Sequence, residues 1–160
     1  MMSDPGHLSV HRFLSMHSES FQFYNHSGIE IPFSAEQLKR TIVILQKHEN
    51  RNYSYVELVF VDEKKILDLN RQYLGHDYLT DIITFTYHGD SSISVEGTLF
   101  CCGPQIKRQS DEYGTAYETE VLRVVIHGLL HLIGYDDRTV NQKREMTSLE
   151  DRYIKLYRDS

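Results

Sequence analysis

The stretch VVIHGLLHLIGYDD, residues 124–137, constrains this chain more than any other. It places His127 and His131 four residues apart in an apolar run. Residues i and i+4 lie on one face of a helix, so both imidazoles can reach one point. Gly134 tolerates left-handed backbone angles and is expected to end the helix and turn the chain back, which brings Asp137 to the same point. Two imidazoles and one carboxylate predict a divalent metal site, zinc above all, with a fourth position left for water.

The same spacing of ligands occurs in the extended sites of zincin peptidases. In those enzymes a glutamate follows the first histidine and acts as general base, whereas this chain has Gly128 there. The sequence therefore predicts metal chemistry on a substrate other than a peptide. Glu120 and Arg123 lie on the histidine face of the same helix. We interpret them as its solvated end, the alternative being that they orient an imidazole.

Composition limits the remaining possibilities. A chain of 160 residues with 40% hydrophobic and 25% charged residues is most simply one globular domain. It has no apolar run of the roughly 18 to 20 residues that span a bilayer, so we expect a cytoplasmic protein without a membrane partner. We also expect no organic cofactor. Cys101 and Cys102 are interpreted as small apolar side chains. The net charge of −6 gives no steering towards phosphates, so any RNA contact requires a local basic patch or a complex.

The pattern along the chain predicts an α+β fold: a four-stranded mixed sheet covered by helices, with a zincin-like metal helix in the core. Residues 1–18 are interpreted as a flexible leader, with a hypothetical alternative start at Met16, and residues 19–160 as a single domain. The expected strands or hairpins are 20–33, 53–61, 82–87 and 92–102, the last two joined by a turn at Gly89-Asp90. The expected helices are 35–50 with a capping box at Ser34, 63–74 capped by Asp62, 105–114, 116–132 and 141–158.

The segment HGLLHLIGYDD, residues 127–137, resembles the signature of the YbeY family of bacterial metalloendoribonucleases. A second similar stretch consists of the segments 68–70, 75–77 and 80–85. The resemblance implies an α+β fold, one zinc ion held by three residues, and hydrolysis of single-stranded RNA. It further implies roles in ribosomal RNA maturation and ribosome quality control, with ribosomal RNA and the ribosome or its associated proteins as partners.

The chain departs from the usual family pattern at several positions. The family commonly has histidine where this chain has Asp137; a carboxylate is a competent zinc ligand, but its charge makes bound water less acidic. The catalytic arginine of the family is matched by Leu74. Arg71 and His76 are candidate catalytic replacements, although Arg71 is also typical of a surface helix. Where the family usually has a proline before Thr-Asp, this chain has Leu79. Where the family has Gly-Asp-Ile in a strand, this chain has Gly-Thr-Leu at residues 97–99.

The resulting hypothesis is a zinc-dependent endoribonuclease in which the ion polarises a phosphate oxygen or activates water. Arg71, Lys64 or Lys65 would then neutralise the phosphates. One alternative is a ribosome-associated protein with a structural zinc and little activity, which the net charge and Leu74 favour. Another is a zinc hydrolase acting on a small molecule. An open metal position facing a cleft would distinguish catalytic from structural zinc.

Overall fold

The computed structural model describes residues 21–89 and 93–160, so the predicted leader and the tip of the predicted turn, residues 90–92, lie outside the described residues. The elements in chain order are β1 (Phe21–Asn25), α2 (Ala35–Glu49), β2 (Asn52–Val61), α3 (Glu63–Leu69), η1 (Asn70–Leu74), β3 (Ile82–Thr86), β4 (Ser94–Cys102), α4 (Gly103–Tyr113), α5 (Tyr117–Leu132) and α6 (Val140–Asp159). None of the helices described is both long and apolar enough to cross a membrane.

The strands form one four-stranded sheet in the order β1-β2-β4-β3. β1 and β4 each run parallel to β2, whereas β3 runs antiparallel to β4 and forms an edge. The prediction of a mixed sheet in an α+β fold is therefore confirmed. The antiparallel β3–β4 pair was expected from the turn signal between them.

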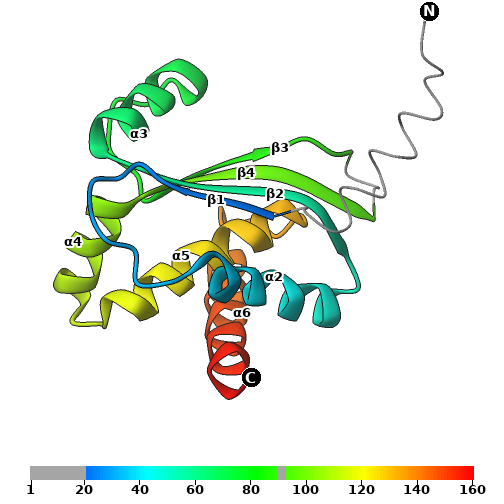
Figure 1. The fold of residues 1–160 in the computed structure, drawn as a ribbon. Coiled ribbons are helices and arrows are strands. Elements are labelled where there is room, and N and C mark those ends of the chain that lie inside the picture. The colour runs from blue at the N-terminus through cyan, green and yellow to red at the C-terminus, as the bar shows by residue number, and fades with distance from the viewer. Residues whose placement is uncertain (1–20, 90–92) are drawn as a thin grey trace, which may run out of the picture.

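The helices divide unequally between the two faces of the sheet. Figure 1 shows α2, α5 and α6 on one face, where buried side chains from both layers form the main core. α3 contributes Ile66 and Leu69 to a smaller cluster with Val59, Val61 and Ile83. α5 lies in the main core, as predicted, because nearly all of its apolar residues are buried.

Two glycines allow α5 and the sheet to approach closely. A Cβ added to Gly128 would lie 2.5 Å from Cδ1 of Ile82 and 3.0 Å from both methyl carbons of Leu99. A Cβ added to Gly97 of β4 would meet the side chain of Leu132 and lie 2.5 Å from the carbonyl oxygen of Phe85. Position 128 therefore faces the sheet, and no side chain from it can reach the histidine face of the helix.

The prediction for residues 20–33 was only partly right. Residues 21–25 form β1, but the second apolar run, residues 29–33, forms no strand. Asn25 explains the break, because its side chain accepts from the Ser27 hydroxyl at 2.6 Å and donates to the Ile29 carbonyl at 2.8 Å. The chain then turns at Gly28, where φ is +79°. Ile31 instead anchors the connection in the core.

The helix predicted for residues 63–74 is divided into two parts. Asp62 caps α3 by accepting from the backbone N–H of Lys65, as expected. From Asn70 the chain widens into the π-helical turn η1, which ends at Gly75 with φ +65°. Such turns are frequent at functional sites. The predicted capping box of Ser34 and Gln37 is also present at the start of α2.

Candidate metal centre

α5 presents two histidines on a half-buried face, while most of its other side chains are buried. His127 and His131 have side chains 23% and 24% exposed, one turn apart. The other faces bury the aliphatic side chains that pack on the sheet and on α6. The packing therefore fixes the helix in place, and the direction of both imidazoles with it.

The end of α5 returns the chain to the histidines through a Schellman motif. The N–H of Gly134 donates to the carbonyl of His131 at 3.0 Å, and the N–H of Tyr135 donates to that of Leu130 at 3.2 Å. Gly134 has φ +103°, a value that favours glycine. The turn leads directly to Asp137, as the sequence predicted.

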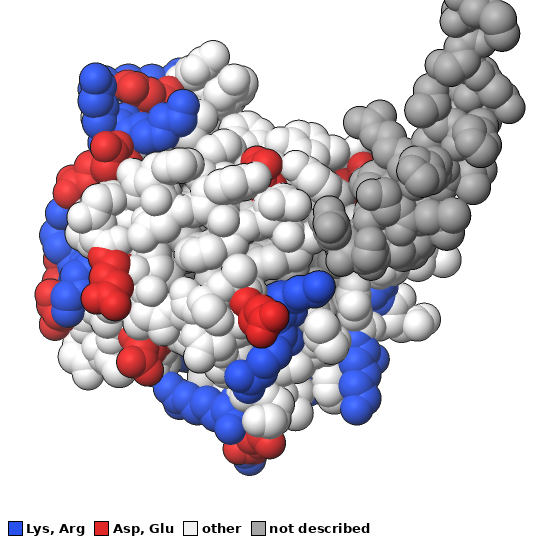
Figure 2. Space-filling view, in the orientation of Figure 1, with Lys and Arg blue, Asp and Glu red and all other residues white. Residues whose placement is uncertain are grey.

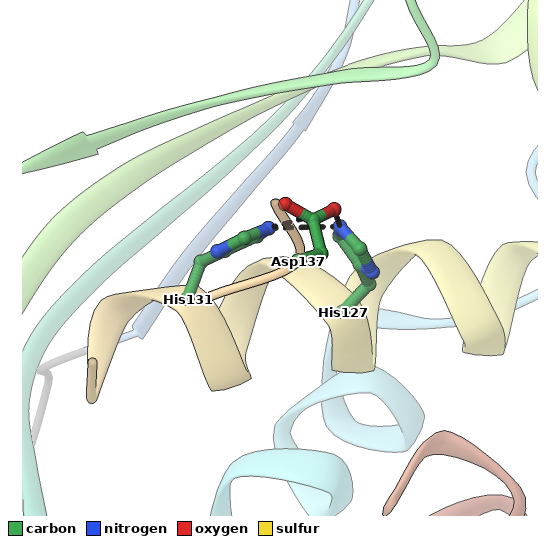
Figure 3. Close-up of side chains that lie close together, drawn as sticks. All are labelled: His127, His131 and Asp137. Atoms are coloured by element: carbon green, nitrogen blue, oxygen red, sulfur yellow. Dashed lines mark hydrogen bonds and ion pairs between the residues drawn. The ribbon is translucent and has the colours of Figure 1, made fainter. Parts of the chain in front are cut away.

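The three predicted ligand side chains converge on one point (Figure 3). The Nε2 atoms of His127 and His131 lie 2.9 Å apart. The Oδ2 atom of Asp137 lies 3.3 Å from the first and 3.5 Å from the second. With zinc–nitrogen bonds of about 2.0–2.1 Å, neighbouring ligands of a tetrahedral ion are about 3.3–3.4 Å apart. The spacing therefore fits a small ion bound by all three.

The other ring nitrogens fix the tautomers. Nδ1 of His127 lies 2.6 Å from a carboxylate oxygen of Glu150, and Nδ1 of His131 lies 2.8 Å from the carbonyl oxygen of Tyr135. Both partners are acceptors, so each Nδ1 carries the hydrogen. The two Nε2 lone pairs of neutral rings then face each other and repel unless a proton or a cation lies between them. This arrangement suits a divalent metal.

The electrostatics around His127 favour positive charge. Burial acts to lower the pKa of its imidazole, but the hydrogen bond to Glu150 and the charges of Glu150 and Asp137 outweigh burial and raise it. Glu150 is itself held by Arg123, whose guanidinium donates to it at 3.1 Å and to Asp151 at 2.7 Å. The same carboxylates therefore attract either a proton or a metal ion to this site.

Tyr135 attaches the turn after α5 to α2. Its hydroxyl donates to Glu49 at 2.7 Å, and Tyr153 of α6 donates to the same carboxylate. Its backbone carbonyl meanwhile orients His131. Tyr135 thus connects the histidine ring to α2, and Glu49 connects α2 to α6.

The three ligand side chains open into a pocket of about 680 Å³. One wall is the edge strand β3 with Ile82, Thr84 and Thr86. The rim is formed by the loop after η1 and by the turn before α6, which carries Arg138. The side chains of His127, His131 and Asp137 remain 23%, 24% and 38% exposed, so a ligand can reach them from the pocket.

This chain is similar to known proteins over most of its length. The sequence profile of the family Endoribonuclease YbeY matches residues 22–158. The chain belongs to the YbeY family. It is 38% identical over 135 residues to Endoribonuclease YbeY of Chlorobium phaeobacteroides, covering 84% of this chain and 95% of that one. It is 34% identical over 119 residues to that of Chloroherpeton thalassium, covering 74% and 83%.

The solution structure of TM1509 from Thermotoga maritima has a similar fold. The TM-score is 0.62 at 28% sequence identity, with 86% of this chain and 88% of that chain covered. The likeness of this chain to a solved structure therefore extends over most of both chains at the level of the overall fold. The YbeY relatives also match this chain over most of their own length.

The candidate catalytic residues lie in different surroundings within this YbeY fold. His76 lines the pocket, and so does Leu74, the residue that the resemblance matched to an arginine of the family. Arg71 is 55% exposed and forms an ion pair with Asp77 at 2.5 Å, and it is not among the residues that line the pocket. Lys65 borders a separate hollow on another part of the surface.

The interpretation of Glu120 and Arg123 as a solvated helix end was wrong. Glu120 is only 5% exposed and accepts from Gln109 at 3.4 Å, and its burial raises the pKa of its carboxyl group. Arg123 reaches α6 and holds Glu150, so it acts on His127 through that carboxylate. α6 packs against this face of α5, and the sequence of α5 alone does not show that the face is covered.

Sequence reasoning missed two residues of the site, Glu150 and Arg138. Glu150 lies on the buried stripe of α6 with Met146 and Tyr153. A carboxylate at such a position was a usable signal, because a buried charge needs a partner. Arg138 follows Asp137 directly, and its backbone N–H donates to the capping residue Gln142.

Proposed function

We propose that this YbeY-family chain is a zinc-dependent endoribonuclease that cleaves single-stranded RNA in ribosomal RNA maturation and ribosome quality control. It acts in the cytoplasm on ribosomal RNA, with the ribosome or ribosome-associated proteins as partners. The observation that carries the proposal is the pair of Nε2 atoms of His127 and His131, which meet Asp137 in the lining of a pocket.

The chain itself performs the tasks of binding and orientation. A zinc ion at His127, His131 and Asp137 would supply Lewis acidity and a bound water of lowered pKa. Glu150 keeps the proton of His127 on Nδ1, and the Tyr135 carbonyl does the same for His131. Both Nε2 lone pairs are thereby directed at the same point.

Arg138 is the residue we assign to the RNA phosphate. It borders the pocket with a side chain 85% exposed, and its Nε contacts Asp136 at 3.2 Å. A guanidinium has five N–H donors, so this ion pair leaves donors for a phosphate oxygen. On the face shown in Figure 2, basic and acidic side chains are interspersed.

The geometry favours catalytic over structural zinc. Within residues 21–89 and 93–160, the candidate group at this pocket consists of three side chains, and all three line the pocket wall. A structural zinc site usually has four protein ligands and is closed. The alternative of a ribosome-associated protein with little activity therefore has less support than the nuclease.

The decisive experiment replaces one ligand. His127→Ala should abolish both stoichiometric zinc, measured by elemental analysis after dialysis and reloading, and cleavage of single-stranded ribosomal RNA fragments. His26→Ala is the matched control, because His26 borders a different hollow. Full nuclease activity in a metal-free His127→Ala protein would overturn the proposal. Stoichiometric zinc without cleavage in the natural chain would favour the structural alternative.

A further inference from the structure

Two aromatic side chains form a stacked pair at the rim of the metal pocket. The rings of His76 and Tyr78 have centroids 4.9 Å apart and planes 16° from parallel. The Tyr78 hydroxyl and Nδ1 of His76 are hydrogen-bonded at 3.0 Å. His76 lines the pocket, whereas Tyr78 is 55% exposed. Tyr78 therefore backs the imidazole from the outer side.

The loop that carries this pair is fixed at both ends. The N–H of His76 donates to the carbonyl of Asn70 at 3.1 Å. The fully buried Asn70 side chain donates to the Tyr78 carbonyl at 3.2 Å and to the Thr80 hydroxyl at 2.9 Å. Aromatic side chains with few rotatable bonds on an anchored loop lose little freedom when a ligand binds.

The pair has the properties of a platform for a flat ligand. A nucleobase offers a π-face to an aromatic ring only when it is unpaired and unstacked, which makes such platforms selective for single strands. Stacking also requires no positive charge, so it suits a chain with a net charge of −6. In this interpretation His76 binds a base of the RNA, whereas the sequence suggested it as a catalytic residue.

We propose that the His76–Tyr78 pair stacks one unpaired base of the RNA next to the phosphate held at the metal pocket. This inference rests on the proposed function, since it names how the same site selects single-stranded substrate. Removing the platform should weaken RNA binding and raise KM, and it should leave kcat nearly unchanged, because the base lies beside the reacting phosphate.

The test uses the full-length protein in chelator, so that the probe is not cleaved, and a single-stranded RNA decamer with 2-aminopurine at successive positions. At one position the natural chain should quench the fluorescence, and an abasic residue there should lower affinity about tenfold. Tyr78→Leu combined with His76→Leu should lose both effects. His76→Phe and Tyr78→Phe should retain them, because each keeps an aromatic ring.

Tyr113→Leu is the matched control, because Tyr113 is an exposed tyrosine on α4. Equal affinity for abasic and intact RNA in the natural chain would overturn the inference, and so would loss of quenching in His76→Phe. Absence of RNA binding would overturn it as well. Cleavage by the zinc-loaded natural chain is measured in parallel: cleavage without abasic sensitivity refutes the platform alone, and abasic sensitivity without cleavage refutes the nuclease alone.

Discussion

The Nδ1–H group of His127 donates a 2.6 Å hydrogen bond to Glu150, a residue of another helix 23 positions later in the chain. The Glu150 side chain is 8% exposed and also accepts from Arg123. A buried carboxylate in this position makes the imidazole a stronger ligand and fixes its orientation. The geometry of the candidate metal centre therefore depends on the packing of α6 against α5.

We predict that Glu150→Gln lowers zinc affinity about 10- to 100-fold while the fold is retained. The amide can still accept from Nδ1, but it carries no charge to strengthen the imidazole. Competition with a chromophoric chelator measures the affinity, and circular dichroism checks the fold. Asp151→Asn is the matched control, since Asp151 also pairs with Arg123. Equal zinc affinity in the two variants would contradict the prediction.

Arg138→Gln should weaken RNA binding in a manner that depends on salt. If the guanidinium binds one phosphate, the slope of log K against log salt falls in magnitude by about 1. Fluorescence anisotropy in chelator, at several salt concentrations, gives the slope without cleavage. Arg144→Gln serves for comparison, because Arg144 borders a separate hollow on α6. An unchanged slope in Arg138→Gln would exclude a phosphate contact.

The contact between Tyr135 and Glu49 should make stability sensitive to alkali. The hydrogen bond to Glu49, together with burial, raises the pKa of Tyr135 to about 12. In the unfolded chain the pKa returns to about 10, so the unfolded chain loses a proton that the folded chain keeps. This residue therefore lowers the free energy of unfolding as pH rises from about 10 to 12.

Tyr135→Phe removes both the hydrogen bond and the ionisation. The variant should be about 1 kcal/mol less stable than the natural chain at pH 7, and the difference should narrow by about pH 11. Urea denaturation at the two pH values measures it. Tyr113→Phe, at an exposed tyrosine, is the control. If the difference in the free energy of unfolding is the same at both pH values, the pKa of Tyr135 is the same in the folded and the unfolded chain.

Gly97→Ala should destabilise the sheet by about 1–3 kcal/mol. The added methyl would lie 2.5 Å from the Phe85 carbonyl oxygen, and this backbone atom can move only if β3 shifts. Gly89→Ala is the matched control, because a Cβ there meets nothing within 4 Å. Urea denaturation compares the stability of the two variants. Equal midpoints would show that the sheet accommodates the added methyl group at position 97 without loss of stability.

The convergence of the three candidate ligands was predictable from the sequence because these residues are local. His127, His131 and Asp137 lie within one helix and the turn that follows it, where spacing alone determines their relative positions. Helix caps at Ser34 and Asp62 were predictable for the same reason, since each involves neighbours three residues apart.

Features that require distant segments to meet were not predictable in this way. Glu49 receives hydrogen bonds from two tyrosines 86 and 104 residues away. Nothing in the sequence around Glu49 identifies these partners. The break after β1 was missed for a different reason. The period-two pattern of residues 29–33 is typical of a strand, but the side chains of Asn25 and Ser27 donate hydrogen bonds to the backbone carbonyl of Ile29 instead.

The contact of Gly128 with Ile82 and Leu99 also bears on how this scaffold can evolve or be redesigned. A glutamate at position 128 would push a carboxylate between two aliphatic side chains, so one substitution cannot turn this chain into a peptidase of the His-Glu-x-x-His type. Any proton acceptor for a new reaction must be recruited from β3, the loop after η1 or the turn before α6. The close packing of α5 on the sheet thus determines which segments around the pocket can carry a new catalytic side chain.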